Sequence, residues 1–140
     1  MYALGIDGGG SRTRALLCDT LGQIIGQGLS GGTNPRTSTT GELKAHLQEA
    51  IEQATRSIDS SKILAAHFGL AGAGDAGTRA KVQAITKELL CKETTCTIGH
   101  DLEIALVGGL GSKTGIVLVA GTGSACYGCT CDGRSTKCGD

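Results

Sequence analysis

The chain has 140 residues, of which 13 are basic and 13 acidic, so its formal net charge is zero. Binding to nucleic acid through phosphates needs clustered Lys and Arg, and because both signs of charge are scattered here, the composition argues against a nucleic-acid partner. The apolar runs, such as Ile116 to Ala120, are far shorter than the roughly 18 residues typical of a membrane span. The N-terminus also lacks the basic region and long apolar core of a secretory signal, so we expect a soluble, cytoplasmic protein without a membrane partner.

The three opening apolar runs are separated by short turns, which predicts an antiparallel meander of three strands. Apolar strands then alternate with helix-spaced apolar residues, which predicts parallel strands added to the same sheet and covered by helices. The expected fold class is therefore α/β, a mixed sheet in which the meander precedes alternating helices and parallel strands. The expected ranges are strands at 2–6, 13–18 and 23–29, a helix at 40–58, a strand at 63–70, a helix at 76–90, a strand at 95–99 and a helix from 101 to 108.

A second unit of strand, glycine turn and strand begins with the apolar run 115–120 and continues through 125–131. It repeats the opening unit, so we interpret the two as the starts of two related domains. The first domain is expected at 1–112, and 113–140 is expected to be the first hairpin of an incomplete second domain. Because a lone hairpin cannot bury a core, we expect the chain to be the amino-terminal part of a longer protein.

The turn that follows the first strand has a composition suited to anions. It reads Asp7-Gly8-Gly9-Gly10-Ser11-Arg12-Thr13. Glycines without a Cβ let backbone N–H groups approach an anion, and the hydroxyls of Ser11 and Thr13 are donors suited to phosphate oxygens. Asp7, at the end of the strand, could hold a hydrated magnesium ion. The alternative is an ordinary tight hairpin, although three successive glycines exceed what such a turn needs.

Three further sites offer related chemistry. The turn Gly121-Thr122-Gly123-Ser124 resembles the first, and two such turns could hold a polyphosphate from opposite sides. Asp101 follows a strand and starts a helix, where it suits an N-cap and equally a general base. Asn34, in a glycine-rich loop, could bind a polar substrate or simply turn the chain.

Two other patterns suggest different functions. Residues 72–77 read Gly-Ala-Gly-Asp-Ala-Gly, a formal dinucleotide fingerprint, but the long meander before them argues against that assignment. Four cysteines near the end of the chain are enough for a tetrahedral zinc or iron–sulfur site. The expected strand would put two of them on one face and one on the other, which weakens that interpretation. They are Cys126, Cys129, Cys131 and Cys138.

Five motifs together resemble one known family. They are Leu4 to Thr13, Gly32 to Pro35, Gly69 to Gly74, His100-Asp101 and Val119 to Ser124. They are similar to motifs of the N-acetylglucosamine kinase and BadF/BadG/BcrA/BcrD ATPase family, within the sugar kinase, Hsp70 and actin superfamily. The resemblance implies a ribonuclease H-like first domain of a two-domain actin-like ATPase fold, with ATP and Mg²⁺ as cofactors and an amino sugar, N-acetylglucosamine or glucosamine, as the substrate.

The resemblance also implies roles for individual residues. Asp7 would bind magnesium, and Asp101 would take the proton from the attacking hydroxyl. The phosphates would be bound by Gly8, Gly9, Gly10, Ser11, Thr13, Gly121, Thr122 and Gly123, and the sugar by Asn34, Gly72, Asp101 and Ser124.

Two other functions remain open at this stage. One is an ATP-driven activator of a 2-hydroxyacyl-CoA dehydratase type enzyme, in which cysteines hold an iron–sulfur cluster. The other is a sensor of sugar or nucleotide that kept the fold without the chemistry. The sequence leaves open which sugar is used and whether the protein is a homodimer.

Overall fold

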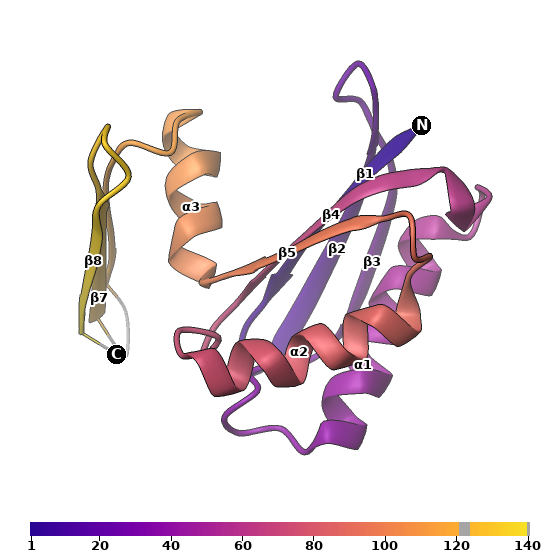
Figure 1. Ribbon diagram of the computed structural model, residues 1–140, viewed down its shortest axis with the longest axis horizontal. Coiled ribbons are helices and arrows are strands. Elements are labelled where there is room, and N and C mark those ends of the chain that lie inside the picture. Colours follow the sequence, from indigo (N-terminus) through magenta and orange to yellow (C-terminus); the bar gives the residue numbers. More distant parts are fainter. Residues whose placement is uncertain (121–123, 140) are drawn as a thin grey trace. The chain divides into compact units, whose positions relative to one another are not determined.

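The computed structural model describes residues 1–120 and 124–139, which form two compact units. The first unit comprises residues 1–100, and the second begins at Asp101 (Figure 1). The helix that starts at Asp101 is therefore grouped with the strands that follow it. The expected boundary between two ATPase domains, after residue 112, stays a prediction.

A five-stranded mixed sheet forms the first unit, in the order β3-β2-β1-β4-β5. The first three strands pair antiparallel and the last two join in parallel, as the sequence predicts. Strand β1 lies at the centre of the sheet. The strands are β1 Tyr2–Gly8, β2 Arg12–Asp19, β3 Ile24–Gly31, β4 Ile63–Leu70 and β5 Thr95–Gly99.

Helices α1 (Thr40–Thr55) and α2 (Ala76–Leu89) cover one face of this sheet (Figure 1). The strands alternate between buried and exposed residues, so one face supplies the core and packs against the apolar stripes of both helices. A 3-10 turn, Ser60–Lys62, leads into β4. Among the described residues, no helix is both long and apolar enough to cross a membrane.

Helix α1 ends earlier than its apolar spacing predicts. The spacing extends to Ile58, whereas the helix stops at Thr55 and Arg56 is its C-cap. The amide of Ile58 donates to the carbonyl of Thr55 in a turn, and the Ile58 side chain still packs against the core. A residue in a turn can thus extend the apolar pattern of a helix without belonging to it.

Two glycines of β3 allow α1 to lie directly on the sheet. A Cβ on Gly26 would be 3.1 Å from the carbonyl carbon of Ala54, and one on Gly28 would be 2.9 Å from that of Ala50. The side chain of Gln53 also accepts a hydrogen bond from the amide of Leu29 at 3.0 Å. Because β3 is an edge strand, this bond satisfies a donor that has no neighbouring strand.

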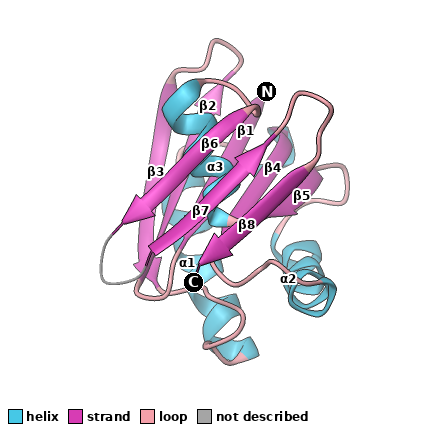
Figure 2. Cartoon of the chain, turned by 90° about the vertical axis from the view of Figure 1, so that its left-hand side faces the viewer, coloured by secondary structure: helices cyan, strands magenta, loops and turns pink. Residues whose placement is uncertain are grey.

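The second unit contains α3 (Asp101–Leu110) and a three-stranded antiparallel sheet. Its strands are β6 Gly115–Ala120, β7 Ser124–Cys129 and β8 Ser135–Gly139, which lie side by side in Figure 2. Strand β7 ends two residues before the expected Cys131, which lies in the turn that follows. Strand β8 is not predicted by the sequence, because its residues Ser-Thr-Lys-Cys-Gly are all exposed and carry no apolar alternation.

Candidate functional site

The turn after β1 is held by the loops that follow two other strands. The amide of Gly9 donates to the carbonyl of Arg12 at 2.9 Å and closes the hairpin. The carbonyl of Gly9 accepts from the amide of Thr33 at 2.9 Å, and the carbonyl of Gly8 accepts from the amide of Ala71 at 2.8 Å. Both carbonyls therefore point into the protein, where their negative ends are satisfied and do not repel an anion at the outer side of the turn.

Close packing around this turn explains several of its glycines. A Cβ on Gly8 would lie 2.5 Å from Cδ2 of Leu70, and a Cβ on Gly32 would lie 2.6 Å from the carbonyl carbon of Gly10. Nδ1 of His46, on α1, lies 2.8 Å from the carbonyl oxygen of Gly32 and holds that loop from the other side. The backbones of the 8–11 turn and the 31–34 loop thus touch without side chains between them.

A buried pair of hydroxyls links the same two segments. Oγ1 of Thr13 donates to the carbonyl of Gly31 at 2.7 Å and lies 2.8 Å from Oγ1 of Thr33, and neither side chain is exposed. The sequence places Thr13 among residues that face a phosphate, whereas its hydroxyl is used inside the protein and supports the turn. Thr33 carries no chemistry in the sequence-based prediction. Thr13, Ala15 and Leu17 are the buried residues at every second position of β2. This alternation in the sequence indicates that Thr13 belongs to the core.

The candidate sugar-binding residues Asn34 and Gly72 lie side by side. Gly72 has a φ of +83°, in the left-handed region that favours glycine, and a Cβ there would be 2.9 Å from Cγ of Asn34. Oδ1 of Asn34 accepts from the amide of Arg36 at 2.9 Å, so the side chain is held in a turn. Asn34 and Gly72 therefore meet where the loops after β3 and β4 approach each other.

The end of β5 lies next to the loop that follows β4. Gly69 of β4 is aligned with Gly99 of β5, and the ring of His100, which is buried, lies next to Gly74. Asp101 directly follows His100 in the chain and is the first residue of α3, within the second unit. Ser124, the first residue of β7, also belongs to the second unit. Gly121, Thr122 and Gly123 lie outside the described residues.

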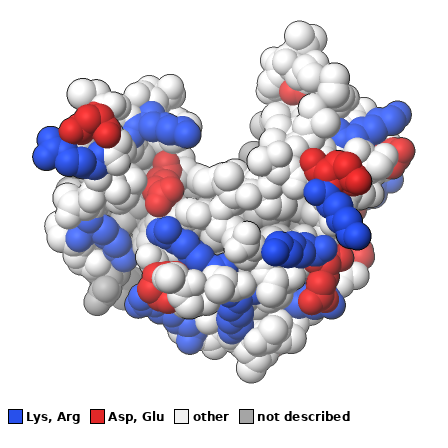
Figure 3. Space-filling model, viewed as in Figure 1, with Lys and Arg blue, Asp and Glu red and all other residues white. Residues whose placement is uncertain are grey.

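Charged side chains that the sequence does not single out hold the loops after β3 and β4 in place. Arg36 pairs with Asp75 at 3.2 Å, and Nζ of Lys81 donates to the carbonyls of Pro35 and Ser38 at 3.2 and 3.0 Å. A hydrogen bond from the amide of Thr78 lowers the pKa of Asp75, and the side chains of Thr78 and Arg36 lower it further. Figure 3 shows basic and acidic side chains interspersed on the visible face, with no large region of one sign.

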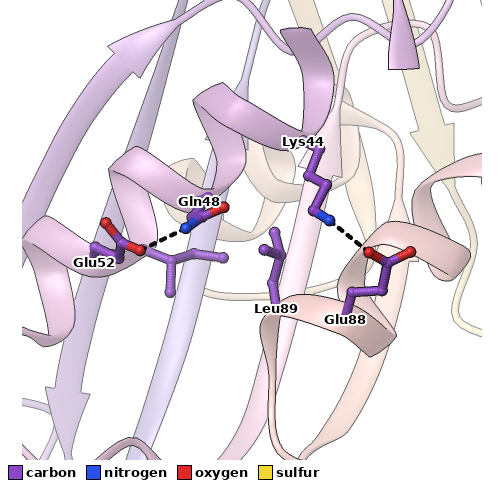
Figure 4. A pocket seen from close by; sticks show the side chains of 6 residues that line it. Lys44, Gln48, Glu52, Glu88 and Leu89 are labelled. Carbon is purple, nitrogen blue, oxygen red and sulfur yellow. Dashed lines mark hydrogen bonds and ion pairs between the residues drawn. The ribbon is translucent and has the colours of Figure 1, made fainter. Parts of the chain in front are cut away.

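A separate hollow of about 240 Å³ lies between α1 and α2 (Figure 4). Nζ of Lys44 lies 2.6 Å from a carboxylate oxygen of Glu88 across it, and Gln48 donates to Glu52 along its wall. Because these groups satisfy one another, the hollow is a seam between two helices and not part of the candidate site.

Asp7 is the residue of the first unit that fits a magnesium ion. Its carboxylate is exposed at the carboxyl end of the central strand, beside the glycine turn. Mg²⁺ keeps several of its waters and is commonly held by one or two carboxylates together with substrate phosphates. A single exposed carboxylate next to a turn that is a candidate for phosphate binding fits that description.

Known proteins resemble this chain over nearly its whole length. An N-acetylmuramic acid/N-acetylglucosamine kinase of Clostridium acetobutylicum is 33% identical over 140 residues, which cover 99% of this chain and 45% of the relative. An N-acetyl-D-glucosamine kinase of Dictyostelium discoideum is 27% identical over 146 residues, 97% of this chain and 46% of the relative. The chain spans under half the length of these curated relatives.

The fold is similar to that of a solved structure, a proposed N-acetylglucosamine kinase from Chromobacterium violaceum. The TM-score is 0.75 at 22% identity, over 97% of this chain and 47% of that one. The expected α/β fold with a mixed sheet is thereby confirmed. Residues 4–139 match the BadF/BadG/BcrA/BcrD ATPase family as a whole, and the chain belongs to that family.

Proposed function

We propose that the protein containing this chain transfers the γ-phosphate of ATP to a hydroxyl of an amino sugar, N-acetylglucosamine or glucosamine. Membership of an ATPase family and the names of the two curated relatives support this proposal. The observation that carries it is the convergence of the loops after β3 and β4 on the 8–11 turn, with an exposed carboxylate at Asp7. Phosphoryl transfer depends mainly on positioning and charge neutralisation. The turn would position the phosphates, and a magnesium ion held by Asp7 would neutralise part of their charge.

In this proposal the 8–11 turn binds the phosphates of ATP. The amide of Gly9 is used inside the hairpin, where it donates to the carbonyl of Arg12. The glycines would let the other backbone amides of the turn approach phosphate oxygens, and the exposed Ser11 adds a hydroxyl donor. Asp7 would hold magnesium through water, and the ion would neutralise part of the negative charge on the phosphates. Thr13 and Thr33 keep the turn in place from within the core.

Asn34 and the backbone near Gly72 would bind the sugar. A carboxamide has an acceptor oxygen and two N–H donors, and this set is complementary to sugar hydroxyls and to an acetamido group. The bond from the Arg36 amide fixes the orientation of the Asn34 side chain before a substrate arrives. Ser124 is a further residue proposed to bind the sugar.

Asp101 would act as the general base. The sugar hydroxyl oxygen would form a bond to the γ-phosphorus while the bond to the bridging oxygen breaks, ADP would leave, and the hydroxyl proton would pass to the Asp101 carboxylate. A positioned base of this kind contributes roughly 10²- to 10⁴-fold to the rate. The second glycine turn, Gly121 to Gly123, is also proposed to bind phosphate.

The test is phosphate transfer by the full-length protein, measured with ATP, Mg²⁺ and each of N-acetylglucosamine, glucosamine, N-acetylmannosamine and glucose. Turnover on one amino sugar that falls at least about 100-fold in Asp101→Asn, with nucleotide binding retained, is the expected result. Glu103→Gln, which removes the other carboxylate of the same helical turn, is the matched control and should stay active. Sugar-independent ATP hydrolysis that survives Asp101→Asn would contradict the kinase proposal and favour the dehydratase activator.

A further inference from the structure

Two of the four terminal cysteines face each other across the second sheet. Cys126 of β7 and Cys138 of β8 are Cα partners in the antiparallel register. Cys129 is instead aligned with Ser135, and Cys131 lies in the turn between the strands. The proposed kinase chemistry uses none of these thiols, and all four are free.

The hairpin geometry sets the spacing of Cys126 and Cys138. The amide of Thr130 donates to the carbonyl of Arg134 at 2.9 Å, which makes these two residues a hydrogen-bonded pair. Hydrogen-bonded pairs recur at every second position, so Cys126 and Cys138 also form one, with Cα atoms about 5.5 Å apart. Disulfides typically span Cα separations of about 4.4–6.8 Å, so the backbone positions are suitable for a cross-link.

Both thiols lie on the same face of the sheet, because directly opposite residues of an antiparallel pair share a face. Within this unit, α3 packs against β6 and β7. Burial is the largest cause of the raised pKa of Tyr127, and the charge of Glu103 on α3 raises it further, which indicates that Tyr127 lies on the face that α3 covers. Successive residues of a strand alternate, so Cys126 lies on the face opposite Tyr127. Its other cross-strand partner, Leu118, is 69% exposed, Cys138 is exposed and Cys126 is half-buried.

We propose that Cys126 and Cys138 are a redox site, which forms a reversible intramolecular disulfide by exchange with a low-molecular-weight disulfide such as oxidised glutathione. One thiolate attacks the oxidant to give a mixed disulfide and one glutathione thiol, and the second thiolate then displaces the other glutathione. The two cysteines lose two electrons and two protons, which appear in the two molecules of reduced glutathione.

The cross-link is expected to be labile, not a permanent structural bridge. Cβ atoms of directly opposite residues lie about 4.5–5.5 Å apart, whereas a relaxed disulfide needs about 3.5–4.5 Å. The two strands must therefore move together slightly, and strained disulfides are the more easily reduced ones. The second sheet would be cross-linked in oxidising conditions and released by a thiol reductant.

Mass spectrometry of the full-length protein, treated with oxidised glutathione and then alkylated under denaturing conditions, tests the proposal. The expected product is a Cys126–Cys138 cross-link that disappears on reduction with dithiothreitol. Cys126→Ser and Cys138→Ser should each lower the cross-linked fraction at least about tenfold. The matched control Cys129→Ser changes a thiol of the same strand on the opposite face and should leave the cross-link intact.

A second measurement needs no substitution. Phenylarsine oxide binds two neighbouring thiols at once, so it should protect Cys126 and Cys138 together from alkylation in the unmodified protein. Stable single glutathione adducts, or a cross-link through Cys129 or Cys131, would overturn the proposal. Neither readout depends on sugar phosphorylation, so failure here is distinguishable from failure of the proposed function.

Discussion

The buried hydroxyls of Thr13 and Thr33 show how single residues support the 8–11 turn from within the core. Thr13 lies on β2, Thr33 lies in the loop after β3, and their oxygens are 2.8 Å apart in a fully buried environment. Buried polar groups are costly unless they are hydrogen-bonded, so each hydroxyl depends on the other. The pair therefore couples the position of the 31–34 loop to that of the first hairpin.

Replacing either threonine by valine, which keeps the shape and removes the hydroxyl, tests this coupling. Thr13→Val should lower the free energy of unfolding by about 1–3 kcal/mol, because the Gly31 carbonyl and the Thr33 hydroxyl lose a buried partner. The double variant with Thr33→Val should cost less than the sum of the two single changes. Denaturant unfolding measures the stability of both single variants and of the double variant. The control is Thr20→Val, at an exposed turn position, for which we expect little effect. Strictly additive costs would show that the two hydroxyls are not coupled.

At the scale of elements, the packing of α1 on β3 depends on the absence of side chains at two positions. The edge strand lies close enough to the helix for Gly26 and Gly28 to face its backbone carbonyls. This close approach also lets Ser30 donate to the carbonyl of His46 at 2.7 Å. Since His46 holds the Gly32 loop, the position of α1 is connected to the candidate site.

Gly28→Ala should therefore destabilise the first unit by about 1–3 kcal/mol, because the helix must move away from the strand. The matched control is Gly5→Ala in β1, where an added Cβ meets nothing within 4 Å. Thermal unfolding of both variants gives the comparison. A Gly28→Ala protein as stable as Gly5→Ala would mean that α1 can shift without cost.

The start of α1 makes the stability of the helix dependent on pH. Thr39 and Glu42 form a capping box, in which Glu42 accepts from the Thr39 hydroxyl and amide at 2.7 and 2.9 Å. The hydrogen bond from the Thr39 side chain lowers the pKa of Glu42, and the backbone bond lowers it further.

A lowered pKa in the folded state means that this contribution is present at neutral pH and is lost as pH falls through the folded pKa. Glu42→Gln should thus lower the melting temperature at pH 7. The difference in melting temperature between this variant and the unchanged protein should narrow as the pH falls from about 5 to about 3. Glu49→Gln, at an exposed position of the same helix, is the control. A melting-temperature difference that does not vary with pH would show that the Glu42 carboxylate is not the cause of the pH dependence.

For the molecule as a whole, the sequence predicts the five-stranded sheet because most of its strands and helices carry strong apolar periodicity. Strand β8 is not predictable in this way, because Ser135 to Gly139 are all exposed and carry no apolar alternation that would indicate their pairing with β7. The proximity of Asn34 to Gly72 is implied by the resemblance, whereas the Thr13–Thr33 pair and the Lys81 contacts join residues far apart in sequence. The Cys126–Cys138 register depends on a strand that has no apolar pattern. Local patterns therefore predict the elements and the motifs, but not the bonds between loops.

The position of the glycine turn at the end of the central strand has an entropic consequence. Its two inward carbonyls are bonded to the loops after β3 and β4, so the turn is ordered as soon as the sheet has formed. Fixing the backbone of one residue costs roughly 1–2 kcal/mol in lost conformational freedom, and here that cost falls on folding and not on ligand binding. A phosphate bound here, as proposed, would meet a preorganised surface, so the cost of ordering the turn would not be subtracted from its affinity.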